Sequence, residues 1–260
     1  MSDFLNTIRC LKEEEIAARK HEMPISEFRA RIRGLPSARD FRGALKKTRI
    51  ALIAEVKKSS PSAGVIVEEI DPGIIALRYQ EGGAAAVSVL TESRYFSGEI
   101  NHLEIVKAAV SIPVLRKDFI IDEYQIYESR VAGADAILLI SELIDRERLE
   151  TFLALSHQLG LACLVESHSR DELEKAIASG AVILGVNNRD LDTLNVDLDT
   201  AVRLLPLIPG ERTRVAESGI KTPEDVMRMT EAGANAILVG ETLVRCGDPK
   251  KKIKELLRAE

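Results

Sequence analysis

Residues 131–140, VAGADAILLI, run from the end of an expected helix through Gly133 into an expected strand of apolar residues. The same order recurs in residues 81–90 (EGGAAAVSVL), 177–186 (IASGAVILGV) and 231–240 (EAGANAILVG). A glycine directly after a helix is the usual residue for a left-handed cap. We therefore interpret each copy as the join between a helix and the strand that follows it.

Strand-like and helix-like segments alternate around these copies from residue 49 onward. The expected strands are residues 50–56, 84–90, 112–116, 134–140, 161–166, 182–186, 213–217 and 235–239. Such alternation predicts parallel pairing, and eight units in this length fit a closed (β/α)8 barrel. The four copies lead into the second, fourth, sixth and eighth strands, so the repeat spans two units and suits an even, closed barrel. A doubly wound open sheet remains the alternative, because a count of eight strands does not prove closure.

Residues 1–48 differ from the rest of the chain. They are highly charged, show helical spacing, and contain too few large apolar residues for a core of their own. The fold prediction is therefore an α/β (β/α)8 TIM barrel with an N-terminal helical extension. We expect residues 1–260 to form one barrel domain, with residues 1–48 packed on it.

The composition excludes several classes of protein. The net charge of −5 disfavours a nucleic-acid partner, whose binders usually carry a basic field, although a local pocket can still be basic. The three cysteines are scattered, and the four histidines form no HExxH pattern, so we expect a reduced protein without a metal. The chain shows no signal peptide and no apolar run long enough for a bilayer. We expect a cytoplasmic protein without a membrane partner.

Charged residues gather at the carboxyl ends of the odd-numbered strands. In barrels of this kind the active site lies at this end of the strands. We therefore expect one catalytic cluster, composed of Glu55, Lys57, Lys117, Glu166 and Glu217 together with Asn187 from the end of the sixth strand. Structural ion pairs remain the alternative, but buried pairs are costly to desolvate and seldom add much stability. A lysine in such a place can have its pKa lowered toward neutrality.

A phosphate site is predicted from the loops after the seventh and eighth strands. These loops place Ser218, Gly219, Gly240 and Glu241 where a short helix N-terminus can bind an anion, as is common in such barrels. Glu241 would serve through its backbone, with its carboxylate turned away. Lys57 and Ser60 could close the site from the other side. Ordinary helix capping at the two glycines is the alternative.

Seven motifs in order carry a resemblance to a known family. They are IAEVKKSSPSAG (53–64), SVLTESRYFSG (88–98), VLRKDFIID (114–122), LVESHS (164–169), LGVNNRDLDT (184–193), VAESGI (215–220) and ILVGETLV (237–244). Together they resemble indole-3-glycerol phosphate synthase, a barrel enzyme of tryptophan biosynthesis. The resemblance covers nearly the whole chain, including MPISEFRARI (23–32) in the extension.

The resemblance implies a ring closure without a metal or organic cofactor. The family's substrate is the small phosphorylated molecule 1-(2-carboxyphenylamino)-1-deoxyribulose 5-phosphate, which loses carbon dioxide and water. Lys117 matches the family's general acid and Glu166 its general base. Phe96 and Phe119 match aromatic residues near the anthranilate ring, and Arg189 matches a loop residue at the same mouth. Ala63 departs from the family, which is usually basic there.

Two other functions remain open at this point. Phosphoribosylanthranilate isomerase is also a phosphate-binding barrel, but its acid/base pair would place a cysteine at the end of the first strand, where this chain has Glu55 and Lys57. A barrel that has lost catalysis and serves as a scaffold would not need Lys117 and Glu166. We expect a monomer or weak homo-oligomer.

Overall fold

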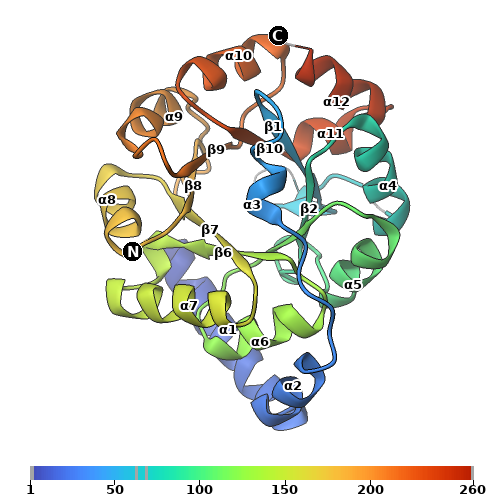
Figure 1. The fold of residues 1–260 in the computed structure, drawn as a ribbon, viewed down its shortest axis with the longest axis vertical. Helices are drawn as coiled ribbons and strands as arrows, with labels where there is room; N and C mark the ends of the chain where they lie inside the picture. The colour runs from blue at the N-terminus through green and yellow to red at the C-terminus, as the bar shows by residue number, and fades with distance from the viewer. Residues whose placement is uncertain (1–2, 62–63, 68–69, 259–260) are drawn as a thin grey trace.

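Eight parallel strands form a closed barrel in the computed structural model, which describes residues 3–61, 64–67 and 70–258 (Figure 1). The barrel strands are β1 (Ala51–Val56), β4 (Ala86–Leu90), β5 (Val114–Lys117), β6 (Ala136–Ile140), β7 (Ala162–Ser167), β8 (Ile183–Asn187), β9 (Thr213–Glu217) and β10 (Ala236–Val239). Each pairs in parallel with the next, and β1 closes the ring by pairing with both β4 and β10. The predicted barrel is confirmed, and the open sheet is excluded.

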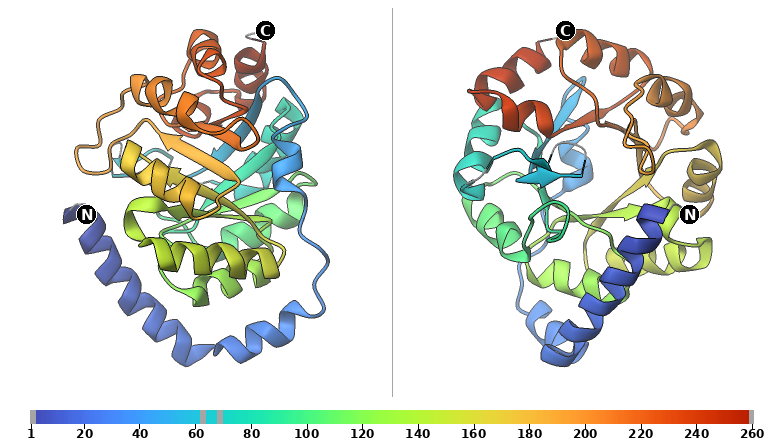
Figure 2. Two further views of the ribbon diagram at one scale, coloured as in Figure 1. Left: turned by 60° about the vertical axis from the view of Figure 1, so that its left-hand side comes forward. Right: turned by 180° about the vertical axis from the view of Figure 1, so that it is seen from behind.

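Helices surround the barrel and connect its strands (Figure 2). They are α4 (Pro72–Gly82), α5 (Ile100–Ala109), α6 (Glu123–Val131), η1 (Ser141–Leu143), α7 (Arg146–Gln158), α8 (Arg170–Ala178), α9 (Asp199–Leu204), η2 (Leu205–Leu207), α10 (Pro223–Glu231), α11 (Glu241–Arg245) and α12 (Pro249–Leu257). The four glycines at the repeated joins, Gly83, Gly133, Gly180 and Gly233, all have positive φ, between 87° and 102°. The repeat in the sequence therefore marks a repeated helix cap. Each cap directs the chain from the end of a helix into an even-numbered strand.

The expected strands begin one or two residues before the observed ones at most positions. The extra residues already bond to the neighbouring strand, since the Ala85 amide donates to Leu52 O over 2.8 Å and the Asp135 amide to Val114 O over 2.8 Å. A short hairpin of β2 (Ser59–Ser60) and β3 (Gly64–Val65) in the first loop was not predicted. Ala63 lies outside the described residues.

Residues 3–48 are largely helical, as expected, apart from residues 33–40, and they run along the barrel from its mouth to its floor (Figure 2). They contain α1 (Asp3–Glu22), α2 (Ile25–Ile32) and α3 (Phe41–Ala44). Arg9 in α1 donates to Leu143 O, and Phe28 in α2 packs against Tyr124 of α6 with ring centroids 5.1 Å apart. At the floor, Arg42 donates to Thr213, the first residue of β9. The extension thus touches both ends of the barrel.

No helix in the described part of the chain is both long and apolar enough to cross a membrane.

Candidate active site

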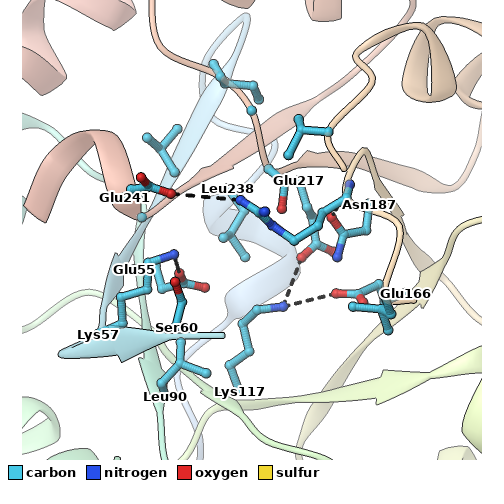
Figure 3. Close-up of a pocket in the computed structure, with 18 of the residues that line it drawn as sticks. Glu55, Lys57, Ser60, Leu90, Lys117, Glu166, Asn187, Glu217, Leu238 and Glu241 are labelled. Carbon is cyan, nitrogen blue, oxygen red and sulfur yellow. Dashed lines mark hydrogen bonds and ion pairs between the residues drawn. The ribbon is translucent and has the colours of Figure 1, made fainter. Parts of the chain in front are cut away.

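A cavity of about 420 Å³ opens at the carboxyl ends of the barrel strands, a size typical of small-molecule sites. Every residue predicted for the site lines it (Figure 3). They are Glu55, Lys57, Ser60, Phe96, Lys117, Phe119, Glu166, Asn187, Arg189, Glu217, Ser218, Gly219, Gly240 and Glu241. The structure thus brings the predicted residues together in one cavity, while the site itself and the role of each residue stay predictions.

Lys117 stands at the base of this cavity between two buried carboxylates. Its ammonium donates to Glu166 Oε2 over 3.0 Å and to Glu217 Oε2 over 3.3 Å. The lysine side chain is 16 % exposed, whereas those of Glu166 and Glu217 are almost fully buried. We call Lys117, Glu166, Glu217 and Glu55 the inner cluster. Each comes from a different odd-numbered strand, and alternate strands supply each layer of side chains in such a barrel.

The electrostatics of Lys117 differ from the expectation. Burial alone lowers the pKa of the ammonium, but the charges of Glu166, Glu217 and Glu55 outweigh it and raise the pKa above that of a free lysine. The expected fall toward neutrality was wrong, because three carboxylates surround one cation. Lys117 is therefore a fully charged hydrogen-bond donor at neutral pH.

The two glutamates beside Lys117 have opposite electrostatics. Burial raises the pKa of the Glu166 carboxyl, but Lys117 and His168 outweigh it, and the net pKa is lowered. Burial and the neighbouring Glu166 charge raise the pKa of Glu217. Of the two carboxyl groups that share the Lys117 ammonium, Glu166 is thus the ionised one and Glu217 is the one that holds its proton more firmly. That division suits acid/base chemistry.

Glycines on even-numbered strands make room for these carboxylates. A Cβ built on Gly185 in β8 would lie 2.2 Å from Glu217 Oε1, and one on Gly240 would lie 2.2 Å from Glu55 Oε1. Such distances leave no space for a side chain. Glu55 also holds Lys57, whose ammonium lies 2.9 Å from its Oε1. This ion pair explains why the first strand ends in two charges on the same face.

The predicted phosphate side is built from a strained turn after β9. Ser218 has φ of 66°, which is uncommon for a residue with a side chain. Asn188 donates from its side chain to Ser218 O over 3.1 Å and accepts the Ala201 amide. Gly219 also has positive φ, and a Cβ there would lie 2.5 Å from Val196. The turn is therefore fixed by its neighbours, as preformed anion sites require.

The expected orientation of Glu241 was wrong. Its carboxylate is not turned away but faces Arg189 across the cavity, with Oε2 3.8 Å from Arg189 Nη2 (Figure 3). Its other oxygen lies 2.9 Å from Arg245 Nε. The Glu241 carboxylate therefore lies between Arg189, which lines the cavity, and Arg245 of the same helix.

An aromatic wall lies on another side of the cavity. Phe96 and Phe119 have ring centroids 6.3 Å apart, and Phe4 approaches Phe119 at 6.4 Å and Tyr95 at 5.3 Å. Phe4 lines the cavity although it belongs to the N-terminal extension. The sequence gives no signal for this residue, because it lies more than a hundred positions from Lys117.

A second charge group lies behind Lys117, on the outer face of β5. Arg116 is fully buried and donates hydrogen bonds to the hydroxyls of Thr91 and Ser129. It also forms ion pairs with Asp118 over 3.0 Å and with Glu128 over 2.8 Å. Lys12 from α1 binds the other oxygen of Asp118 over 2.9 Å. We call Arg116, Asp118, Glu128 and Lys12 the outer cluster. It ties the extension to the strand that carries Lys117.

Sequence reasoning also missed His168, which stands beside Glu166. With Glu142 and Glu172 it forms the group in the described chain whose potential ligand atoms all lie within 4.8 Å of one another. The imidazole already lies between two carboxylates, at 3.4 Å from each. We therefore interpret this group as a cluster of ion pairs, and the expectation of no metal stays a prediction.

Comparison with known proteins agrees with this geometry. The model of the indole-3-glycerol phosphate synthase family matches residues 5–256. The indole-3-glycerol phosphate synthase of Polaromonas naphthalenivorans (strain CJ2) is 47% identical over 260 residues, covering 98% of this chain and 99% of that protein. That of Laribacter hongkongensis (strain HLHK9) is 46% identical over 261 residues, with coverage of 98% and 99%.

A solved structure of thiamine phosphate pyrophosphorylase from Pyrococcus furiosus matches with a TM-score of 0.62 and 16% identity. The match covers 85% of this chain and 97% of that one, and it shows a shared fold alone. The family model and the two relatives are evidence for the family as well as the fold, because they cover nearly the whole chain, including every residue of the inner cluster. The chain belongs to the indole-3-glycerol phosphate synthase family.

Proposed function

We propose that this chain converts 1-(2-carboxyphenylamino)-1-deoxyribulose 5-phosphate into indole-3-glycerol phosphate, with loss of carbon dioxide and water, in tryptophan biosynthesis. The observation that carries the proposal is the position of Lys117, a charged donor held between two buried carboxylates at the base of the cavity. Membership of the family supplies the identity of the substrate.

Ring closure requires stabilisation of a developing alkoxide. The aromatic carbon that bears the carboxylate attacks the ribulose carbonyl, and the ammonium of Lys117 donates a proton to the carbonyl oxygen. Loss of carbon dioxide then restores the aromatic ring. Because Lys117 carries its full charge, it stabilises negative charge on that oxygen in a partly dry site, where such a contact is worth more than in water.

Dehydration requires both a base and an acid. Glu166 is the proposed base, since Lys117 and His168 keep its pKa low and its carboxylate ionised. The departing hydroxyl leaves as water once it receives a proton. Lys57 is the second ammonium in the cavity and the candidate donor, because Glu55 holds it 2.9 Å away at the end of β1. Asn187 and Glu217 complete the polar floor.

The phosphate group and the anthranilate ring of the substrate need different contacts in the cavity. The phosphate fits the turn formed by Ser218 and Gly219 together with the Gly240–Glu241 backbone, with Ser60 and Arg189 at the rim. The anthranilate ring fits the wall of Phe96, Phe119 and Phe4. The catalytic cluster lies in the same cavity, where both ends of one substrate can reach it.

We further propose that residues 1–260 work as one barrel domain with residues 1–48 packed on it. The contacts of Lys12 and Arg9 with the barrel support this organisation. We propose a cytoplasmic monomer or weak homo-oligomer that uses neither a cofactor nor a metal and has no nucleic-acid or membrane partner.

A turnover assay tests the function directly. The purified chain is mixed with the proposed substrate in the presence of a chelator, and indole absorbance and carbon dioxide are followed together. We expect one molecule of carbon dioxide for each molecule of indole-3-glycerol phosphate formed. The variant Lys117→Met at the same protein concentration should give no product. Unchanged substrate with a folded parent chain would overturn the proposal.

A further inference from the structure

The carboxylate of Glu166 interacts with the Asn187 side chain and with His168 as well as with Lys117. In the structure Lys117 holds Glu166 Oε2 over 3.0 Å. If Lys117 donates to the substrate oxygen during ring closure, as the proposed function requires, this bond weakens before Glu166 acts in dehydration. The opposite oxygen, Oε1, faces His168, whose Nε2 lies 3.4 Å away.

The local sequence aims His168 at this oxygen. His168 directly follows the end of β7 at Ser167, two residues after Glu166, and its ring lies beside the Glu166 carboxylate. Its side chain is 13 % exposed, compared with 2 % for Glu166. The imidazole thus covers the outward side of the carboxylate and shields it from solvent.

The other side of the imidazole is held by Glu172, in the first turn of α8. His168 Nδ1 lies 3.4 Å from Glu172 Oε2, and because neither ring nitrogen makes a hydrogen bond in the described chain, both carboxylates contact the ring as ion-pair partners. The Glu172 carboxylate is itself fixed, because it accepts the His168 amide over 2.9 Å and the Ser169 hydroxyl over 2.7 Å. Ser169 in turn accepts the Glu172 amide as the N-cap residue of α8. Glu172 is therefore a rigid support for the ring.

We propose that His168 is a positioning residue for Glu166, clamped by the helix cap at Glu172 so that it keeps the base in place when Lys117 turns to the substrate. This inference rests on the proposed function and adds a residue that acts through Glu166. The charged groups around the imidazole are mainly carboxylates: Glu166 on β7, Glu172 on α8, Glu142 on η1, Glu217 on β9 and Asp190 in the loop after β8, with the Lys117 ammonium on the far oxygen of Glu166. These acids favour the imidazolium, although burial opposes it, and the net pKa of His168 is raised.

Two amide substitutions separate the two contacts of the ring. In His168→Gln the amide nitrogen reaches the place of Nε2 and keeps a donor to Glu166. In His168→Asn the shorter amide reaches only the place of Nδ1 and keeps a donor to Glu172. Both variants remove the imidazolium charge, so they form a matched pair that differs in which carboxylate keeps its partner.

The measurement is the steady-state rate of indole-3-glycerol phosphate formation as a function of substrate concentration, with a chelator in the buffer. We expect His168→Asn to slow it about 10- to 100-fold, the cost of a misplaced catalytic group, with KM nearly unchanged. His168→Gln should stay close to the parent at its optimum pH. Because neither variant keeps the cation that lowers the Glu166 pKa, the acidic limb of both pH profiles should move to higher pH.

Thermal unfolding of the same variants distinguishes a structural role. Stability should follow the Glu172 contact, so His168→Asn should unfold at a temperature no lower than His168→Gln does. If His168→Asn keeps the parental rate, or if loss of activity in the pair simply follows loss of stability, the inference is overturned. An inactive parent would instead contradict the proposed function.

Discussion

Lys117 and Arg116 are neighbours on β5, yet their side chains enter two charge clusters with opposite properties. In the inner cluster, Lys117 is accessible from the cavity, and among the described residues Glu217 Oε1 is buried without a hydrogen-bond partner. In the outer cluster, Arg116 is inaccessible and each of its three nitrogens donates to the protein. A charge cluster that is open and incompletely bonded is suited to chemistry, whereas one that is closed and fully bonded is suited to holding elements together.

The largest expected effect is on kcat and comes from removing the ammonium of the inner cluster. Lys117→Ala should lower kcat by about 10²- to 10⁴-fold, because a positioned acid is lost. Its unfolding temperature should change little or rise, since two buried carboxylates lose a cation but one can take up a proton. Lys117→Met keeps most of the apolar stem and serves as the control for packing. A parental kcat in both variants would remove the distinction between the clusters.

The outer cluster should show the reverse pattern. Arg116→Met removes the buried cation that Asp118 and Glu128 share, which leaves Lys12 on Asp118 and Arg19 on Glu128. The free energy of unfolding should fall by about 3–5 kcal/mol, the typical cost of breaking a buried pair from one side. Below its unfolding temperature the variant should retain much of the parental kcat. Arg170→Met, which removes an exposed ion pair with Glu174, is the control and should change stability little. Chemical denaturation at constant pH measures both.

The clusters should also respond to pH in opposite directions. The Glu217 pKa is raised in the fold, so the native state holds a proton that the unfolded chain has lost, and stability falls as pH rises from about 4.3 toward the raised value. Burial raises the pKa of Asp118, but the charges of Lys12 and Arg116 lower it by more, so the net pKa is lowered. The contribution of Asp118 to the free energy of unfolding is therefore present above about pH 3.9 and is lost as the pH falls.

Glu217→Gln and Asp118→Asn test these signs by denaturation between pH 5 and 9. Glu217→Gln should gain stability relative to the parent as pH rises, by about 1.4 kcal/mol for each unit by which the folded pKa exceeds the unfolded one. Asp118→Asn should lose stability throughout this range. A pH-independent difference for Glu217→Gln would mean that the carboxyl is ionised in the fold.

The smallest effect is expected at the rim. Glu241→Gln frees Arg189 from a competing carboxylate, so inorganic phosphate should inhibit about two- to fivefold more strongly, as for a partly exposed ion pair worth about 0.5–1 kcal/mol. The gain should shrink in high salt, because the contact is screened. Unchanged phosphate inhibition in both salts would show that Glu241 does not compete with the anion.

Much of this arrangement is visible in the sequence, for a physical reason. Strands that are buried on both faces read as apolar runs, so a charge at a strand end is conspicuous, and parallel strands bring all such ends to one rim. That logic found Glu55, Lys117, Glu166 and Glu217. The helix caps at the repeated glycines revealed the two-unit period in the same way.

What the sequence hides depends on contacts between distant segments. Phe4 reaches the cavity only because α1 runs along the barrel, and Lys12 is buried only because Asp118 lies opposite it. The pKa of Lys117 was misjudged because burial was weighed without the number of carboxylates around it. His168 had a local signal in the ESHS stretch, two residues after Glu166, but its partner Glu172 reads as an ordinary cap.

The central claim, that the inner cluster divides the reaction between an acid and a base, is tested most directly by single-turnover release of carbon dioxide and formation of indole in Lys117→Ala and Glu166→Gln. Decarboxylation follows ring closure, which needs the acid, whereas the base is needed only for dehydration. Lys117→Ala should therefore suppress both signals, and Glu166→Gln should release carbon dioxide well before indole appears. Equal suppression of carbon dioxide release in the two variants would contradict the account.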